Sequence, residues 1–146
     1  IHFDGSQKTK GLSDYLNDGV PLSNILMESG TENLQVIHSG PSTERSTELI
    51  GSKRMEELLT DLKNRGDSTY ILIDSSPIIS TSEPALLSRL VDGILLVILA
   101  DRTPKEHVQR ALKSIDRQKI IGVVFNQVDV EPSSHYAKYY YHYYRK

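Results

Sequence analysis

The sequence contains no cysteine. Disulfide bonds, thiolate metal sites and a cysteine nucleophile are therefore excluded, and this composition fits a cytoplasmic protein. No apolar run approaches the ~20 residues that a membrane-spanning helix needs. The net charge is only −2, so the overall charge does not favour nucleic acid as a partner. What remains is a chain of 146 residues, 38% of them hydrophobic, which predicts one globular domain of ordinary size.

Long apolar runs alternate with helix-like patterns in the body of the chain. We predict strands near residues 34–38, 70–74, 93–100 and 120–126. The runs "YILI" and "GILLVILA" are continuous, whereas a strand buried on one face alone would alternate apolar with polar residues. Continuous apolar strands separated by helices indicate a mainly parallel sheet covered on both faces, which is an α/β fold with three layers.

Helix signals lie between these strands. The stretch "GLSDYL" predicts a short helix with Ser13 as its N-cap. Gly51 predicts a break between a short helix and a long one that begins near Ser52. "EPALLSRL" carries proline in its first turn, and "TPKEHVQRALKSI" is expected to begin with Thr103 as its cap, followed by proline.

Three polar side chains are candidates for ligand binding. Asp74 ends "YILID", at the carboxyl edge where open α/β sheets bind ligands; it suits Mg²⁺, directly or through water, or else it caps a turn. Asn126 ends "IIGVVFN" and suits a nucleobase edge, or else it closes the strand. Arg102 precedes a predicted helix N-terminus and suits an anion, or else it is a surface arginine. Taken singly, Asn126 and Arg102 favour the plainer interpretation.

Six of the eight tyrosines lie near the end of the chain. They are Tyr136, Tyr139, Tyr140, Tyr141, Tyr143 and Tyr144. Three of them are consecutive, so their rings point several ways and packing explains them poorly. The segment is a disordered tail, a sticky low-complexity segment, a stacking platform for single-stranded nucleic acid, or a cluster of phosphorylation acceptors. We expect the chain from about Pro132 onward to be mobile in the isolated molecule.

The order of these segments resembles one family. "GLSDYL", "LQVIHSGP", "ELIGSKRMEELLTDL", "YILIDSSPI", "LVDGILLVILADRTPKEHV" and "IIGVVFNQVD" follow one another, and "YAKYYYHYYRK" comes last. No single motif is specific, but the whole order resembles the bacterial tyrosine autokinases that control capsule and exopolysaccharide assembly. These proteins belong to the deviant P-loop ATPases.

The resemblance implies a fold, cofactors and site residues. The fold would be a three-layer α/β/α, P-loop NTPase-like domain, incomplete at the N-terminus, and the complete kinase would use ATP and Mg²⁺. Asp74 would be the catalytic and metal-binding carboxylate of the Walker B strand. Asn126 and Arg102 would lie at the nucleotide. The six tail tyrosines would be the phosphorylation sites.

The resemblance also implies boundaries and partners. Residues 1–130 would be the C-terminal part of the kinase-like domain, and 131–146 a flexible tyrosine tail. In the family the tail enters a neighbouring subunit's active site, so that a ring forms, and phosphorylation breaks the ring. Implied partners are further copies of the chain, a membrane-embedded polysaccharide co-polymerase that activates the kinase, and a tyrosine phosphatase. The implied location is the cytoplasmic face of the bacterial membrane.

The departures from the family are large. The phosphate-binding loop G-x-x-x-x-G-K-S/T is absent, because none of the nine glycines is followed by lysine. The second nucleotide motif, which ends in Asp-x-Asp, is absent too, and Ser75 and Ser76 replace the usual Thr-Pro. Since the chain opens with Ile1, we expect a fragment, the alternative being a short relative that accepts phosphate without transferring it. Phosphoryl transfer depends on positioning and charge neutralisation, so we expect this chain alone to bind little or no nucleotide and to be inactive.

Two other functions stay open. A partition- or division-type ATPase would share the fold, but such proteins usually end in an amphipathic helix or a basic patch, and the tyrosine tail is neither. A non-catalytic interaction or regulatory domain, whose aromatic tail binds a partner, is compatible with the missing phosphate loop.

Overall fold

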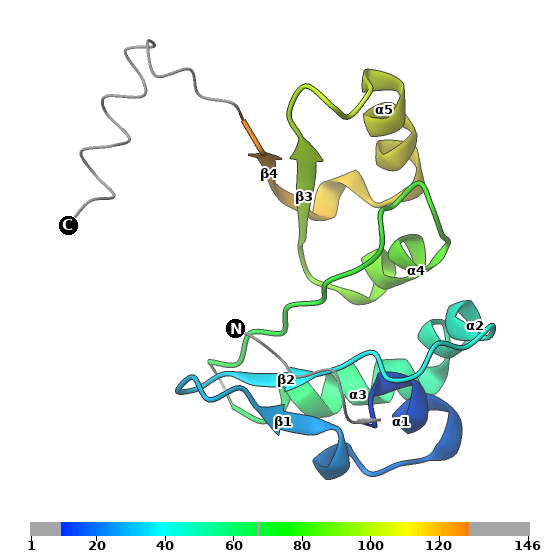
Figure 1. Ribbon diagram of the computed structural model, residues 1–146, viewed down its shortest axis with the longest axis vertical. Coiled ribbons are helices and arrows are strands. Elements are labelled where there is room, and N and C mark those ends of the chain that lie inside the picture. The colour runs from blue at the N-terminus through cyan, green and yellow to red at the C-terminus, as the bar shows by residue number, and fades with distance from the viewer. Residues whose placement is uncertain (1–9, 67, 129–146) are drawn as a thin grey trace. The chain divides into compact units, whose positions relative to one another are not determined.

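The computed structural model describes residues 10–66 and 68–128 (Figure 1). The chain divides after Leu90 into two compact units, which we call unit 1 and unit 2. In unit 1 the elements are α1 (Leu12–Asp18), η1 (Leu22–Asn24), β1 (Leu26–Glu28), β2 (Gln35–Ile37), α2 (Ser46–Ile50), α3 (Lys53–Lys63) and α4 (Glu83–Leu90). In unit 2 they are β3 (Ile94–Leu99), α5 (Lys105–Ser114), η2 (Arg117–Lys119) and β4 (Ile120–Asn126).

The predicted strand at 34–38 exists in shorter form, but it does not belong to the parallel sheet. It is β2, and it pairs antiparallel with β1, a strand that the sequence pattern did not reveal. The pairing places Leu26 opposite Ile37 and Glu28 opposite Gln35. Three residues per strand are too few to show a period in the sequence, so only the chain reversal between them identifies this hairpin.

The start of α1 is fixed by a close approach of two backbone segments. The amides of Leu12 and Ser13 donate to the carbonyls of His38 and Ser39, at 2.8 and 2.9 Å. A Cβ on Gly11 would lie 2.2 Å from the nitrogen of Gly40, so glycine is required there. Gly11, rather than the predicted Ser13, is the N-cap.

The other helices of unit 1 begin and end close to the predicted places. Gly51 separates α2 from α3, and the Ser52 hydroxyl caps α3 by accepting from the Met55 amide, as the sequence predicted. The predicted "EPALLSRL" helix is α4. Because α2 and α3 are separate, each can present its own apolar side to the same core.

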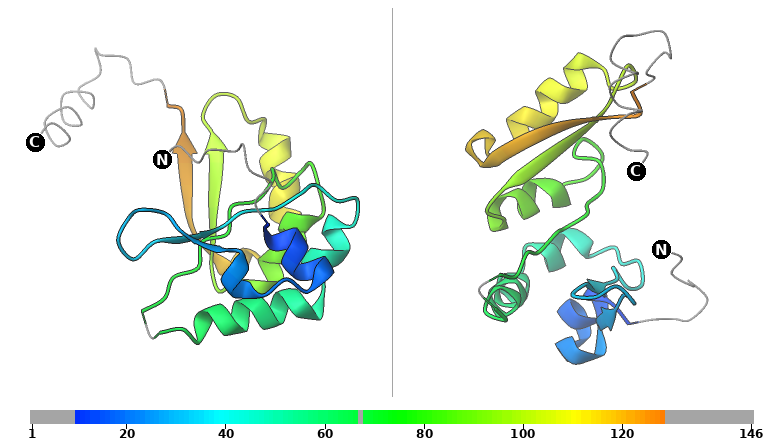
Figure 2. Two further views of the ribbon diagram at one scale, coloured as in Figure 1. Left: turned by 60° about the horizontal axis from the view of Figure 1, so that its bottom comes forward. Right: turned by 90° about the vertical axis from the view of Figure 1, so that its left-hand side faces the viewer.

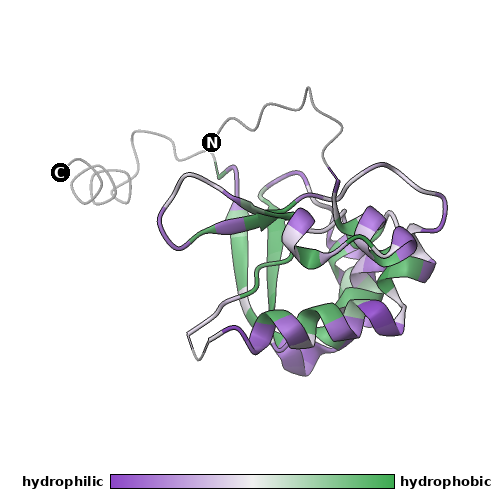
Figure 3. Ribbon diagram, turned by 90° about the horizontal axis from the view of Figure 1, so that it is seen from below, coloured by the Kyte–Doolittle hydropathy of each residue, from purple (hydrophilic) through white to green (hydrophobic). Residues whose placement is uncertain are grey.

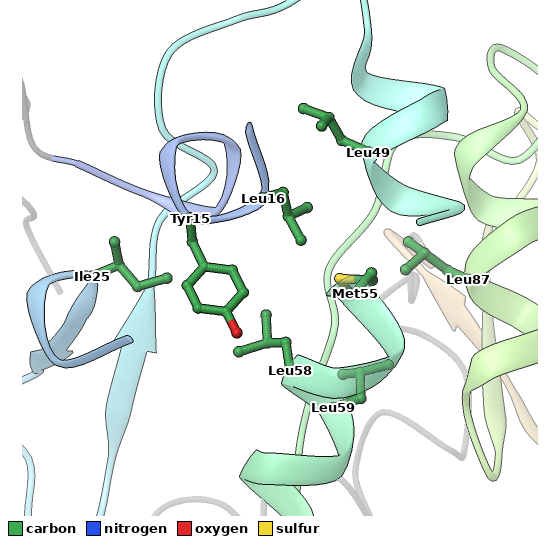
Figure 4. Close-up of a cluster of buried hydrophobic side chains, with 8 residues drawn as sticks. All are labelled: Tyr15, Leu16, Ile25, Leu49, Met55, Leu58, Leu59 and Leu87. Carbon is green, nitrogen blue, oxygen red and sulfur yellow. The ribbon is translucent and has the colours of Figure 1, made fainter. Parts of the chain in front are cut away.

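Helices α1, α2, α3 and α4 bury one hydrophobic cluster. Its members are Tyr15, Leu16, Ile25, Leu49, Met55, Leu58, Leu59 and Leu87. Figure 4 shows the Tyr15 ring of α1 pointing toward Leu58 of α3. The Arg54 guanidinium lies over the same ring, 4.7 Å from its centroid, which is cation–π geometry. Tyr15 is therefore stabilised both by packing in the hydrophobic cluster and by the cation–π contact with Arg54.

Unit 2 is a parallel strand pair joined by a helical crossover. β3 and β4 pair in parallel, with Val97 opposite Val124 and Leu99 opposite Asn126. Helix α5 lies along one side of this pair (Figure 2) and buries Ala111. The predicted cap shifts by one position, because Pro104 rather than Thr103 is the N-cap of α5. Both strands were predicted within one or two residues of their ends.

The predicted strand at 70–74 is absent. The segment carries no regular secondary structure, although Ile71 and Ile73 pack against the core of unit 1. The intervening Tyr70 and Leu72 are 92% and 94% exposed. The segment therefore alternates as an extended chain does, but no described residue pairs with it as a strand, and a strand needs a neighbour to satisfy its backbone groups.

We predict that Leu58→Ala destabilises unit 1 by about 2–5 kcal/mol, since Leu58 is 1% exposed and its truncation leaves a cavity in the core. Leu34→Ala is the control, because Leu34 is exposed outside this cluster and its truncation should cost under about 1 kcal/mol. Urea unfolding followed by circular dichroism measures both. Equal stabilities of the two variants would contradict the assignment of Leu58 to a close-packed core.

Candidate functional site

Asp74 lies in the stretch between α3 and α4. Its side chain is exposed, and it follows Ile73, which packs against the core of unit 1. The inward-facing Ile73 anchors the backbone and turns the next side chain outward, because successive side chains of an extended chain point to opposite sides. The Asp74 carboxylate is thus accessible to a cation, although it does not end a strand as predicted.

A chain of hydroxyl groups fixes the loop that follows Asp74. The Ser46 hydroxyl of α2 donates to the Glu83 carboxylate, and the Thr81 hydroxyl donates to the same group. The oxygens of Ser76 and Thr81 lie 2.7 Å apart. Either hydroxyl can be the donor in this pair. The loop after Asp74 is therefore tied to the start of α4 and to α2.

These hydrogen bonds change the acidity of Glu83. The Ser46 hydroxyl and then the Thr81 hydroxyl lower the pKa of Glu83 below its ordinary value of 4.5, because they stabilise the charged form; partial burial opposes them. Sequence reasoning missed this group. The signal is faint, since it consists of single hydroxyl residues far apart in the chain.

Arg102 and Asn126 lie at the same end of the parallel pair in unit 2. Leu99 is the partner of Asn126 in the β3–β4 register, and the Ala100 amide donates to the Asn126 carbonyl at 2.9 Å. Arg102 follows in the turn between β3 and α5 and is exposed. The carboxyl ends of parallel strands meet at one edge, so the structure brings these two predicted residues to one edge.

The side chain of Asn126 also takes part in the turn that follows β4. Its Oδ1 accepts from the Gln127 amide at 2.9 Å, and Gln127 has a φ of 54°. Asn126 therefore closes the strand, which is the simpler of the two interpretations that the sequence offered for it. This contact uses the amide oxygen, while an amide side chain also carries two N–H donors for a ligand.

Asp74 belongs to unit 1, whereas Arg102 and Asn126 belong to unit 2. That Asp74 and Asn126 lie on one carboxyl rim of the sheet, as parallel strands would place them, therefore stays a prediction. Within residues 10–66 and 68–128, no three His, Asp or Glu side chains gather as a metal site. A shallow depression of about 80 Å³ between α1 and residues 41–43 is far smaller than the few hundred Å³ of a typical ligand site.

The two tyrosines of the body differ in exposure. Tyr70 was predicted to open a core strand, but it is 92% exposed, because the strand is not formed. Tyr15 is the buried one, at 9% exposure, with its ring beneath Arg54. The six tail tyrosines and the proposed boundary at residue 131 lie outside the described residues.

Curated relatives of this chain are bacterial tyrosine kinases. The chain is 30% identical over 132 residues to the putative tyrosine-protein kinase CapB of Staphylococcus aureus, with 89% of this chain and 57% of that protein covered. It is 30% identical over 130 residues to the tyrosine-protein kinase CpsD of Streptococcus pneumoniae, with 88% and 56% covered. The chain is a homologue of bacterial tyrosine-protein kinases. It spans little more than half the length of these two relatives.

The fold agrees with this relationship. The crystal structure of the VpsO kinase domain matches with a TM-score of 0.74 and 27% identity, over 84% of this chain and 60% of that one. The predicted P-loop-like α/β fold with a parallel sheet is thereby confirmed in partial form. No protein-family model matches the chain. No helix among the described residues is both long and apolar enough to cross a membrane.

We predict that Ser46→Ala raises the pKa of Glu83 toward 4.5, because it removes the largest cause of the shift. A lowered carboxyl pKa adds stability above the unfolded pKa, and this is lost as the pH falls through the folded pKa. The variant should therefore lose about 0.5–1 kcal/mol at pH 7, and the difference should vanish in acid below the folded pKa.

NMR titration of the Glu83 carboxyl and urea unfolding across pH measure the two effects. Thr47→Ala is the matched control: Thr47 is the next residue of α2, exposed, and its truncation tests helix propensity alone. An unchanged Glu83 pKa in Ser46→Ala would contradict the role given to the Ser46 hydroxyl.

We predict that this chain alone binds ATP·Mg²⁺ weakly or not at all. Asp74, Arg102 and Asn126 offer one carboxylate, one guanidinium and one amide, but the sequence has no glycine–lysine loop to cradle the phosphates. Calorimetric titration tests this, and micromolar affinity would prove the expectation wrong. Asp74→Asn should then show whether such binding involves the carboxylate.

Proposed function

We propose that this chain is the C-terminal, tyrosine-acceptor part of a bacterial tyrosine autokinase of capsule or exopolysaccharide synthesis. The supporting observation is that it aligns along most of its length with proteins named tyrosine-protein kinases, while its own end holds six closely spaced tyrosines. A phenol needs only exposure and reach to accept phosphate, so a chain without a phosphate-binding loop can still serve as the substrate. The complete kinase would use ATP and Mg²⁺.

Within the complete kinase, the candidate residues would have distinct tasks. Asp74 would hold Mg²⁺, directly or through water, because its carboxylate is exposed on an anchored backbone. Arg102 would neutralise phosphate charge from the edge of the β3–β4 pair, and Asn126 would donate from its amide to the nucleotide. The hydroxyl chain of Ser46, Thr81 and Ser76 would hold the loop after Asp74 in place.

The reaction on the tail is a phosphoryl transfer. The phenolic oxygen of a tail tyrosine forms a bond to the γ-phosphorus of ATP, the bond to the bridging oxygen breaks, ADP leaves, and the phenol proton passes to a base. After Glu131 the tail has three formal positive charges and no acid. Each phosphate adds roughly −1.5 to −2, so six would add about −9 to −12 and make the tail strongly anionic.

This reversal of charge gives the tail a regulatory use. A cationic tail is attracted to an acidic active site on a neighbouring copy, and a phosphorylated tail is repelled from it. Self-association through the tail would thus be reversible, with a tyrosine phosphatase resetting it. The proposal includes a membrane-embedded polysaccharide co-polymerase as the activating partner, which would hold the chain at the cytoplasmic face of the membrane.

Phosphorylation in trans tests the proposal. With full-length CpsD of Streptococcus pneumoniae, ATP and Mg²⁺, we expect several of the six tail tyrosines to be labelled. Tyr15 should stay unlabelled, since its ring is buried. Tyr70 is exposed, but the neighbouring Ile71 packs on the core of unit 1; this limits the reach of Tyr70 into another active site, so we expect it to stay unlabelled. Phosphopeptide mapping measures each site.

Two variants make the test decisive. Replacing all six tail tyrosines with phenylalanine keeps the rings and removes the acceptor oxygens, so label should vanish while the circular dichroism spectrum is unchanged. Tyr70→Phe is the matched control, and the tail tyrosines of this variant should still be labelled. Label that persists in the six-fold variant, or falls mainly on Tyr70 or Tyr15, would overturn the acceptor role and favour an aromatic tail that binds a partner.

A further inference from the structure

The charges of unit 2 lie outside its strands. β3 and β4 contain no Asp, Glu, Lys or Arg, and Figure 3 shows both strands coloured as hydrophobic over most of their length. The described residues of unit 2, 91–128, hold six Lys and Arg side chains against four Asp and Glu. Those of unit 1, 10–66 and 68–90, hold seven against eleven. Unit 2 is therefore the basic part of the described chain, and its charge lies on the segments around the strands.

Helix α5 carries three of these cations on its exposed side. Lys105, Arg110 and Lys113 are exposed, whereas Ala111 is buried. At 3.6 residues per turn the three cations lie on the half of the helix that faces away from Ala111. Glu106 is the one acidic side chain of α5 and is also exposed. We call Lys105, Arg110 and Lys113 the basic face of α5.

The charge of the basic face is not neutralised by the described part of the chain. No ion pair joins its three side chains to a carboxylate within residues 10–66 and 68–128. Arg117 of η2 adds a fourth cation at the C-terminal end of α5, where its Nε donates to the Leu112 carbonyl at 2.9 Å. A row of exposed cations of this kind favours a partner with several negative charges.

The sequence beyond β4 starts at the end of the strand pair where α5 begins. In the parallel register Asn126, the last residue of β4, lies opposite Leu99, the last residue of β3. Helix α5 begins at Lys105, six residues after Leu99, and six residues span at most about 22 Å. The first cation of the basic face is therefore close to the point from which the tail continues.

The tail is long enough to reach the whole basic face. Tyr136 follows Asn126 by ten residues and Tyr144 follows it by eighteen, so the two can lie up to about 35 Å and about 60 Å away along an extended chain. The ten residues of α5 make a helix only about 15 Å long. The six tail tyrosines can therefore approach every cation of the basic face within the same chain.

Phosphorylation decides whether the tail and the basic face attract each other. The unmodified tail has three formal positive charges and no acid after Glu131, so the basic face repels it. Each phosphate adds roughly −1.5 to −2 in charge and three acceptor oxygens. A guanidinium binds a phosphate through two parallel hydrogen bonds, and an ammonium binds it as a point charge. Only the phosphorylated tail is complementary to this surface.

We propose that the phosphorylated tyrosine tail docks on the basic face of α5 in its own chain. This inference rests on the proposed function, because it takes the tail as the phosphate acceptor. Docking adds an attraction to the repulsion described above: the phosphorylated tail is held on its own unit 2, and it is thereby withheld from the active site of a neighbouring copy.

An anionic membrane surface would also be attracted to these cations. The tail is the better match, because it continues directly from β4 and its negative charge depends on modification. A short flexible connection gives such a segment an effective concentration of the order of 1 mM at its site. Weak contacts at an exposed surface are then sufficient for docking.

A synthetic phosphopeptide tests the docking directly. The probe is residues 131–146 with phosphotyrosine at all six tyrosine positions, added at low salt to the full 146-residue chain. Backbone NMR signals of α5 and η2 should shift as the peptide is titrated to a few times about 1 mM, which covers the effective concentration of the tethered tail. The same peptide without phosphate should leave these signals unchanged. Added salt should reverse the shifts, because the contacts are exposed and screened.

A triple variant locates the contact. It replaces the cations of the basic face with glutamine: Lys105→Gln, Arg110→Gln and Lys113→Gln. Glutamine has a helix propensity close to that of lysine and arginine, so the circular dichroism spectrum should not change. The affinity for the phosphopeptide should fall about tenfold or more, because several exposed charge pairs are lost together.

The matched control removes the same number of charges from unit 1. Its changes are Arg45→Gln, Lys53→Gln and Lys63→Gln, all at exposed positions. The affinity of this variant for the phosphopeptide should stay close to that of the unaltered chain. Equal weakening in the two triple variants would overturn the proposal, since it would show an effect of overall charge and no particular site.

The remaining outcomes are also decisive. The absence of shifts at the highest peptide concentration would overturn the proposal, as would shifts confined to segments other than α5 and η2. Vesicles that contain phosphatidylserine are tested in parallel. If they shift the α5 signals and the phosphopeptide does not, a membrane surface is the partner and the proposal is wrong. The phosphates are installed by synthesis, so none of these results depends on whether a kinase labels the tail, and failure here is distinguishable from failure of the proposed function.

Discussion

A parallel strand needs neighbouring strands to satisfy the hydrogen bonds of its backbone, and this requirement explains most features of the structure. β3 and β4 satisfy each other along one edge, because the crossover through α5 returns the chain in the same direction. Beyond that edge the apolar side chains of both strands stay in contact with solvent. Residues 70–74 do not meet this requirement. Ile71 and Ile73 pack on the core of unit 1, but no described strand pairs with the backbone of this segment, so it is not a strand.

Unit 1 is held by a different kind of contact. Side chains from four helices close on one cluster, and Arg54 covers the ring of Tyr15 at its border. The polar chain from Ser46 through Glu83 and Thr81 to Ser76 links α2, the start of α4 and the loop after Asp74. All of these contacts are made within unit 1.

The places of the candidate residues in the chain are compatible with the proposed role as a phosphate acceptor. The groups proposed to meet the nucleotide lie in a loop of unit 1 and at one edge of unit 2, and each is exposed. The tyrosines proposed as acceptors are at the end of the sequence, after β4. A chain built in this way supplies a carboxylate, a guanidinium and phenols, but its sequence contains no phosphate-binding loop.

The sequence by itself determined the helices α1 to α5, the strands β3 and β4, and the kinship with bacterial tyrosine kinases. Those features follow from local signals, such as the Ser52 cap, the Gly51 break and the apolar runs, and from the order of motifs along the chain. Tertiary structure alone decided the β1–β2 hairpin, the hydroxyl contacts of Glu83 and the exposure of Tyr70. The reason is physical: an apolar run records what a side chain prefers, but burial and strand pairing require a partner, and whether that partner is present cannot be read from the run itself.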